Sequence, residues 1–290
     1  MRDWPPIHDP KVLEWLALDD EAWRVVIEQR IRAFGPRPFD AAALEHALGY
    51  PWARPTGSYL LRDGEVELIE DMEPGDRRGA VTAFARGRHP LVAFGANGAP
   101  SRLQVRFAAF DDPADREVLV LTGELHEVDV GAQASPTAFG TMPGALFASA
   151  GTAVRASVLW LTPRQLAELT FAELGYRLGR LDRAHFVMDE AGVEVDDLFA
   201  YVSRIGTLRL GGEPIALAAI PARGRTARAM SQEELFDAVG ALVFDPAVRA
   251  GDVVRMCFAD MPALAEKIWP LTWPTALRLP DEHWTPYPVP

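Results

Sequence analysis

The loop Phe94-Gly95-Ala96-Asn97-Gly98 has the residue types best suited to binding a ligand. It follows residues 90–94, an apolar run typical of a buried strand, and precedes residues 101–107, which have a helix-like pattern. Glycine and asparagine tolerate positive φ angles, so this loop can turn several backbone N–H groups to one side, where they bind a carboxylate or another anion. The alternative interpretation is a tight strand-to-helix turn without a ligand, since glycine-rich turns are common.

The same segment resembles a known family. Residues 90–103, Pro-Leu-Val-Ala-Phe-Gly-Ala-Asn-Gly-Ala-Pro-Ser-Arg-Leu, resemble the Tyr-Gly-Ser-Asn loop of the gamma-glutamyl cyclotransferase-like proteins. Segments similar to the family's later elements follow in the same order: residues 141–146, 151–154 and 159–161, a helix over 163–173 and a strand opening at Tyr176. The resemblance covers roughly residues 90–182. It implies a divergent bacterial member of the family with a mixed, barrel-like β-sheet.

The resemblance also implies a reaction. A glutamate near the end of the helix, shortly before a tyrosine, is the catalytic residue of such proteins, and Glu173 occupies that place. Its carboxylate would take a proton from the α-amino group of a γ-glutamyl amide, which then attacks its own γ-carbonyl, and would return the proton to the leaving amine. This chemistry needs no metal and no cofactor. The residues expected to contact the substrate come from three loops: Phe94, Gly95, Ala96, Asn97, Gly98, Tyr176 and Ser135.

The loop also departs from the family pattern, because the tyrosine is Phe94 and the serine is Ala96, so two hydroxyl groups are missing. The first hypothesis remains a cyclotransferase-like enzyme acting on a small γ-glutamyl or related amide. Two alternatives stay open: a non-catalytic protein that binds a small carboxylate-bearing ligand on the same scaffold, and an interaction protein with an interface at its helical ends. By spacing alone, Glu173 is also compatible with a solvated carboxylate at a helix end, and Ser135 with a turn cap.

Composition narrows the function classes. Of the 290 residues, 49% are apolar and 24% charged, which is typical of a globular chain. The formal net charge of -12 argues against a general nucleic-acid-binding surface. The single cysteine, Cys257, excludes an intrachain disulfide and a cysteine-based metal site. No apolar stretch has the length of a membrane helix and no signal peptide is visible, so we expect a cytoplasmic protein without membrane contact; the oligomeric state stays open.

Helical patterns lie at both ends of the chain and strand patterns in its centre. Residues 10–33, with a break at Asp19-Asp20, and residues 40–49 predict helices, whereas 71–79 predict a loop. Strands are expected at 58–61, 65–69, 90–94, 117–121, 125–130, 154–161, 176–181, 207–210 and 215–220. Helices return over 231–269. We therefore expect an α+β fold in one continuous unit: a helical extension over 1–56, a central domain over 57–222, and a helical extension with an irregular tail over 223–290.

Overall fold

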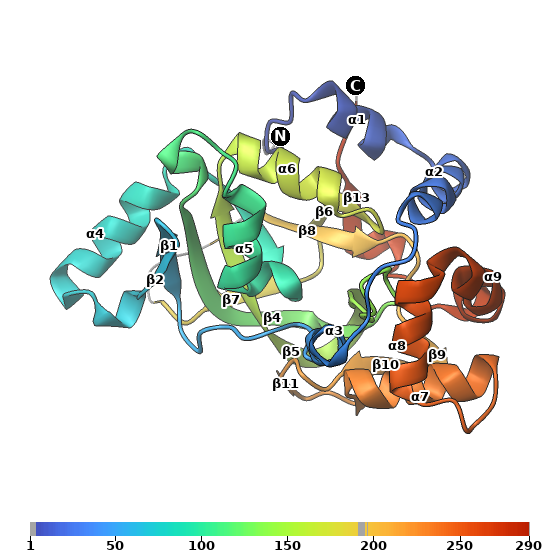
Figure 1. Ribbon diagram of the computed structural model, residues 1–290. Coiled ribbons are helices and arrows are strands. Elements are labelled where there is room, and N and C mark those ends of the chain that lie inside the picture. Colours follow the sequence, from blue (N-terminus) through green and yellow to red (C-terminus); the bar gives the residue numbers. More distant parts are fainter. Residues whose placement is uncertain (1–3, 191–194, 196, 290) are drawn as a thin grey trace.

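A long antiparallel hairpin lies at the centre of the protein (Figure 1). The computed structural model describes residues 4–190, 195 and 197–289. Strands β4 (Val118–Ala132) and β5 (Gly144–Leu161) pair from Leu119 opposite Trp160 to Ala132 opposite Gly144. The sequence predicts two strands over 117–130, but β4 is continuous, because Glu127, with φ +70°, forms a bulge that shifts the register without ending the strand.

The described strands form one mixed sheet around this hairpin, in the order β12-β10-β4-β5-β3-β8-β6-β13. Strand β3 pairs antiparallel with β5 and parallel with β8. The α+β class is therefore confirmed. The described strands do not close into a barrel, since β12 and β13 lie at opposite ends of the order. The remaining strand bounds are β1 Tyr59–Arg62, β2 Glu65–Leu68, β3 His89–Ala93, β6 Tyr176–Leu181, β7 His185–Met188, β8 Leu198–Ser203, β9 Arg209–Leu210, β10 Glu213–Leu217, β11 Ala222–Arg223, β12 Arg228–Met230 and β13 Trp284–Pro286.

The structure contains strands that the sequence patterns do not predict, β7, β8, β11 and β12, and β5 begins ten residues before the expected strand at 154. Two further segments change type. Residues 71–79, expected to form a loop, include the start of helix α4 (Pro74–Ala85). A proline at the first helical position begins it, and Val81 later in the helix is buried against β1 and β4 residues. The tail over 270–290, expected to be irregular, contributes β13, which pairs antiparallel with β6. Both elements depend on contacts with the sheet, which local residue patterns do not reveal.

The helices begin at well-formed caps. Asp9, Asp19 and Asp40 each accept a hydrogen bond from a backbone N–H of the following helix, at 2.8–2.9 Å. The cap at Asp19 is the expected break between the first two helices. The helix bounds are α1 Pro10–Ala17, α2 Asp20–Ala33, α3 Ala41–Leu48, α5 Pro100–Phe107, α6 Pro163–Ala172, α7 Gln232–Val243, α8 Ala250–Ala259 and α9 Met261–Thr272.

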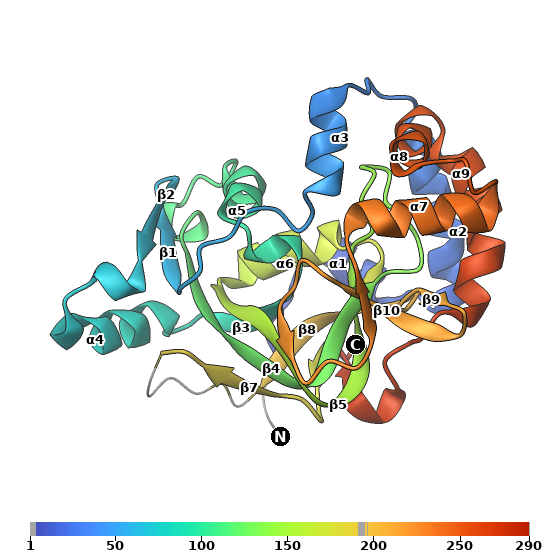
Figure 2. The same cartoon turned by 90° about the horizontal axis from the view of Figure 1, so that it is seen from below.

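Helices α2 and α3 from the N-terminal part of the chain gather with the C-terminal helices α7–α9 on one side of the sheet. Helix α2 packs against α9, and α3 packs against α7 and α8, so segments from opposite ends of the sequence form one layer (Figures 1 and 2). We call α2, α3 and α7–α9 the terminal helices. The sheet therefore carries a second layer that neither end of the chain would form alone.

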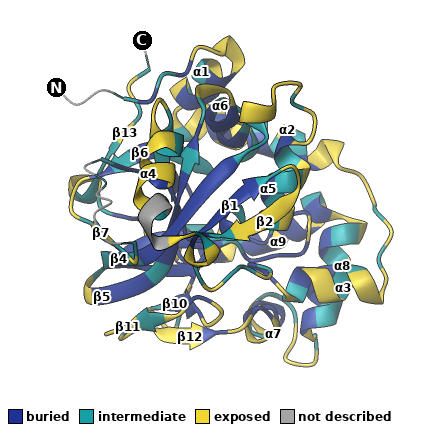
Figure 3. Ribbon diagram, turned by 90° about the vertical axis from the view of Figure 1, so that its left-hand side faces the viewer, coloured by how far each residue is buried: buried dark blue, intermediate teal, exposed yellow. Residues whose placement is uncertain are grey.

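The core lies on both faces of the central strands, as the dark blue strands of Figure 3 show. In β3, Leu91 and Ala93 belong to one apolar cluster and Val92 to another, as strand alternation requires. The first cluster includes side chains of α1, α5 and α6, and the second includes side chains of α2 and α7–α9. The end of β3 thus lies between two packed layers, and the loop that follows it is held from both sides.

Candidate functional site

A cavity of about 310 Å³ lies between the loop after β3, the end of α6 and the terminal helices. Its volume is at the lower end of the range of about 300–1,000 Å³ for small-molecule pockets. Seven of the residues expected from the sequence line it: Phe94, Gly95, Ala96, Asn97, Ser135, Glu173 and Tyr176. Gly98 does not; it is buried behind the loop, where its carbonyl accepts a hydrogen bond from Tyr59 at 3.0 Å.

Helix α6 determines where Glu173 lies. A capping box begins the helix: the Thr162 hydroxyl accepts the Gln165 N–H, and the Gln165 side chain accepts the Thr162 N–H. Ten residues later the helix ends, and Glu173 is its C-cap, with its N–H on the Leu169 carbonyl at 3.0 Å. The chain then turns into β6. The carboxylate therefore leaves the helix at its end and reaches the cavity.

A side-chain hydrogen bond joins Glu173 to the glycine-containing loop. The Asn97 amide donates to the Glu173 carboxylate, Nδ2 to Oε1, at 2.8 Å. Asn97 lies in a short 3-10 turn, Ala96–Gly98, in which the Gly98 N–H donates to the Gly95 carbonyl at 3.1 Å. The two sequence motifs, 76 residues apart, thus meet at one carboxylate, and Asn97 orients it.

The Glu173 carboxylate titrates above its ordinary range. Burial raises the pKa of Glu173, against the lowering effects of the Asn97 hydrogen bond and of the positive charges on Arg106 and Arg102. A carboxylate with a raised pKa holds a proton more readily near neutral pH than an exposed glutamate does. This property suits a group that must both accept and donate a proton.

Two arginines that the sequence analysis did not select, Arg102 and Arg106, line the cavity from α5. Arg106 lies 3.4 Å from the half-exposed carboxylate of Glu168, Nη1 to Oε1. The Arg102 guanidinium lies 5.3 Å from the centre of the Trp52 ring, and no carboxylate of the described residues forms an ion pair with it. Burial lowers the pKa of Arg102, and the charge of Arg106 lowers it further. Arg102 and Arg106 are four residues apart on a helix directly after the loop, so they share one helix face, and this spacing is the sequence signal that could have identified them.

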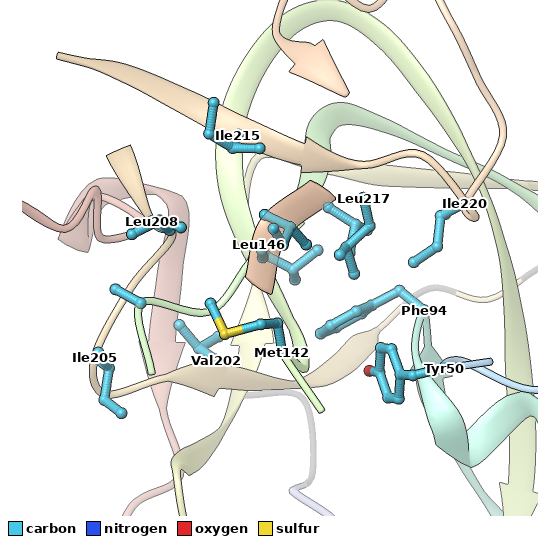
Figure 4. Packing of buried hydrophobic residues seen from close by; sticks show 14 of the residues in the cluster. Tyr50, Phe94, Met142, Leu146, Val202, Ile205, Leu208, Ile215, Leu217 and Ile220 are labelled. Carbon is cyan, nitrogen blue, oxygen red and sulfur yellow. The ribbon is translucent and has the colours of Figure 1, made fainter. Parts of the chain in front are cut away.

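A phenol from outside the resemblance lies beside the loop where the family's hydroxyls are missing. The Tyr50 hydroxyl accepts the Gly144 N–H at 3.0 Å, and a Cβ atom on Gly95 would lie 2.4 Å from the same oxygen. Figure 4 shows its ring next to that of Phe94, whose side chain is buried in the core. Burial raises the pKa of Tyr50 to about 12, against hydrogen bonds from the backbone of Gly144 and Ala96. The phenol therefore stays protonated at neutral pH.

Gly144 also anchors the second tyrosine of the cavity. The Tyr176 hydroxyl donates to the Gly144 carbonyl at 2.7 Å. Burial raises the pKa of Tyr176 well above its ordinary value, so this phenol also stays protonated. The two rings, from residues far apart in the chain, are thus held by the N–H and the C=O of one residue at the start of β5.

The Ser135 hydroxyl is already engaged within the protein. It accepts the indole N–H of Trp269 at 2.8 Å and donates to the Pro136 carbonyl at 3.1 Å. A nearby amide that the sequence analysis did not select, Gln133, also lines the cavity, and its Oε1 accepts the Ser203 hydroxyl at 3.1 Å. Ser135 therefore positions an aromatic wall of the cavity.

The terminal helices supply this wall, although their sequence contains no motif with recognisable chemistry. Trp269 lies in α9 and Trp273 caps its C-terminal end; their rings stack with 4.1 Å between ring centres. Trp23 of α2 stacks on Trp273 with 5.8 Å between ring centres. We call these residues and their apolar neighbours along the cavity the aromatic wall: Trp23, Ile27, Ile31, Phe34, Phe139, Met261, Trp269 and Trp273. The cavity thus has a polar end at Glu173 and an apolar end at the helices.

No family model, curated protein or solved structure matches this chain. The described residues contain no group of three or more His, Cys, Asp or Glu side chains arranged to hold a metal ion. Nor is any helix among them long and apolar enough to cross a membrane. Function must therefore be argued from the side chains of the cavity.

Proposed function

We propose that this protein is a cyclotransferase-like enzyme that acts on a small γ-glutamyl or related amide. The observation that carries the proposal is the hydrogen bond between Asn97 and Glu173 at the wall of a cavity. It supplies a positioned carboxylate with a raised pKa, which is what general acid/base catalysis of such a reaction requires.

In the proposed reaction the ionised Glu173 accepts a proton from the substrate's α-ammonium group. The resulting amine attacks the γ-carbonyl carbon and forms a five-membered ring. Glu173 then gives its proton to the amide nitrogen, the carbon–nitrogen bond breaks, and Glu173 takes the second proton from the new ring nitrogen. It passes that proton to the departing amine, so 5-oxoproline and an ammonium ion leave and Glu173 is ionised again. The proton count balances without a metal, an oxidant or a second substrate.

Two further groups have suitable chemistry for the other charges of this substrate. Arg102 is a cation at the cavity wall without an ion-pair partner among the described residues, so it can hold the substrate's α-carboxylate. Tyr50 remains protonated and lies beside the loop, so its hydroxyl can donate to the oxygen that becomes negative when the γ-carbonyl is attacked. In this proposal Tyr50 takes over the part of the missing loop hydroxyls.

A second candidate is a non-catalytic protein that binds a small anion in the same cavity. It is favoured by the absence of hydroxyls at Phe94 and Ala96. The loop N–H groups of Ala96 and Gly98 are occupied within the protein, by Tyr50 and Gly95, so in this candidate Arg102 would hold the anion in place of the loop. Such a protein would be stabilised by its ligand without turning it over.

The test of the enzymatic proposal is the release of 5-oxoproline from a panel of γ-glutamyl amides by wild type and Glu173→Gln. We expect kcat to fall by roughly 10²- to 10⁴-fold in Glu173→Gln, as is typical when a general acid/base is removed. Glu168→Gln is the matched control, one turn earlier on α6 and outside the cavity lining, and should stay within about threefold of wild type. Thermal unfolding of each variant shows that it folds.

Two outcomes would overturn the proposal. One is wild-type protein that binds γ-glutamyl amides but releases no 5-oxoproline, which would favour the binding protein. The other is a Glu173→Gln variant that retains wild-type turnover, because the carboxylate would then have no part in the reaction.

A further inference from the structure

We propose that the amine half of the substrate is an uncharged aromatic or bulky apolar group, so that the preferred ligand is a γ-glutamyl arylalkylamide. The inference rests on the proposed function for the γ-glutamyl half and adds the chemical class of the leaving group. It is carried by the division of the cavity into a polar and an aromatic end.

The aromatic wall begins directly beside the catalytic carboxylate. The indole N–H of Trp23 donates to the carbonyl of Leu174, the residue after Glu173, at 2.7 Å. Trp23 and Glu173 line the same cavity. A γ-glutamyl group bound at Glu173 would therefore direct the substituent on its amide nitrogen either toward the loop, where Tyr50, Trp52 and Phe94 line the cavity, or toward the tryptophans. The tryptophan side has the larger number of apolar lining residues.

The wall offers little to a charged or polar leaving group. Two of its three indole N–H groups are used within the protein, that of Trp23 on Leu174 and that of Trp269 on Ser135, and the third, on Trp273, is buried without a partner among the described residues. The arginines of the cavity lining, Arg102 and Arg106, come from α5 at the polar end. A leaving group with its own carboxylate, such as an amino acid, would lose its hydration against apolar rings, because the arginines packed on those rings, Arg24, Arg37 and Arg204, are not among the residues that line the cavity.

The stacked rings match a flat apolar group. The separations of 4.1 and 5.8 Å between ring centres describe tryptophans that pack on one another in the cavity lining, with Arg24 over the Trp273 ring and Arg204 over the Trp23 ring. Ile27, Ile31 and Met261 extend the apolar lining. Burial of one phenyl ring against such a surface removes far more apolar area from water than burial of a methyl group does.

The experiment compares kcat/KM for the γ-glutamyl amides of benzylamine, methylamine and glycine with the full-length protein. We expect the benzylamide to be preferred over both others by roughly ten- to hundredfold, the range by which an apolar pocket discriminates groups of different size. In Trp269→Leu the preference should fall by roughly three- to tenfold, since stacking beyond simple burial is lost. Leu271→Ala, exposed on the same helix and outside the cavity lining, is the matched control and should keep the wild-type preference.

A binding measurement separates this inference from the proposed function. The thermal shift of Glu173→Gln at equal concentrations of the three amides reports binding without turnover. Turnover without a preference for the benzylamide overturns the inference and leaves the proposed function standing. If the benzylamide stabilises the variant selectively but wild type turns over none of the amides, the proposed function is overturned and the inference is supported. If there is no turnover and no selective stabilisation, both are overturned.

Discussion

The two ends of the cavity are built by different parts of the chain and by different interactions. The polar end comes from the centre of the sequence, where the loop after β3, helix α5 and the end of α6 meet at Glu173. The apolar end comes from α2 near the N-terminus and α9 near the C-terminus, which pack on each other. In the proposed enzyme, the central part supplies the reaction and the terminal helices supply the choice of substrate.

The two ends of the cavity also differ in their contribution to the stability of the folded protein. At the polar end the Glu173 carboxylate is withdrawn from water, and burial and the charge of Arg106 lower the pKa of Arg102. At the aromatic end, stacked rings and buried aliphatic side chains stabilise the fold. A catalytic site often opposes stability in this way. Removal of the buried charge, as in Glu173→Gln, should therefore raise stability and lower activity, whereas loss of a ring from the aromatic wall should lower both stability and substrate preference.

The largest effect that would separate the two ends is expected from Arg102→Gln. If Arg102 holds the substrate's α-carboxylate, its loss should lower kcat/KM by roughly ten- to hundredfold, the range for a hydrogen bond to a charged group. The loss should be similar for every γ-glutamyl amide, because the α-carboxylate is common to all of them. Steady-state kinetics on the benzylamide and the methylamide measures both points.

The control for this prediction is Arg164→Gln, an exposed arginine on α6 outside the cavity lining. It removes the same charge and should leave kcat/KM near the wild-type value. Equal losses in the two variants would mean that net charge alone matters and would remove Arg102 from the binding site.

A smaller effect is expected from Gly95→Ala, which tests how Tyr50 is seated at the polar end. The added methyl group would lie 2.4 Å from the Tyr50 hydroxyl oxygen but 3.6 Å from the ring carbon that bears it. Gly95→Ala should therefore destabilise the protein by about 1–3 kcal/mol, as overpacking does. In the Tyr50→Phe background the oxygen is absent, so the same change should cost less than about 0.5 kcal/mol.

Urea unfolding of the wild type, both single variants and the double variant gives the coupling between the two positions. Tyr50→Phe alone should cost about 1 kcal/mol, because the Gly144 N–H loses its acceptor. If Gly95→Ala lowers the free energy of unfolding equally in the wild-type and Tyr50→Phe backgrounds, the contact between this loop and the Tyr50 hydroxyl is contradicted.

The sequence allowed prediction of the polar end better than of the aromatic end, for physical reasons. The loop, the capped helix and Glu173 are local features, and the strand-to-helix order fixes their approximate positions. Tyr50 and the aromatic wall reach the cavity only because the terminal helices pack on each other and on the sheet. Their tryptophans have the spacing of ordinary core residues, and no local pattern says which of them face a cavity. For the same reason, strand β13 was missed: its pairing with β6 joins residues about 100 positions apart.

The smallest effect concerns the pH dependence of stability at the polar end. The pKa of Glu173 is raised in the folded state, chiefly by burial, above its value in the unfolded chain. Between those two values the folded state holds a proton that the unfolded state has released, so the carboxylate makes stability fall as the pH rises through this interval. At lower pH both states are protonated and the contribution disappears.

Glu173→Gln removes this titration, because the amide has nearly the same shape and carries no charge. We therefore expect the variant to melt above wild type at pH 7, by a few degrees, with the difference shrinking toward pH 4. Glu168→Gln, whose carboxylate is half-exposed, should show no such trend. A Glu173→Gln variant that melts below wild type at pH 7 would mean that the Asn97 hydrogen bond and the nearby arginines outweigh burial. The carboxylate would then be held in its ionised form and would be a poor proton donor to the leaving amine, so the melting curves test the assigned chemistry without any substrate.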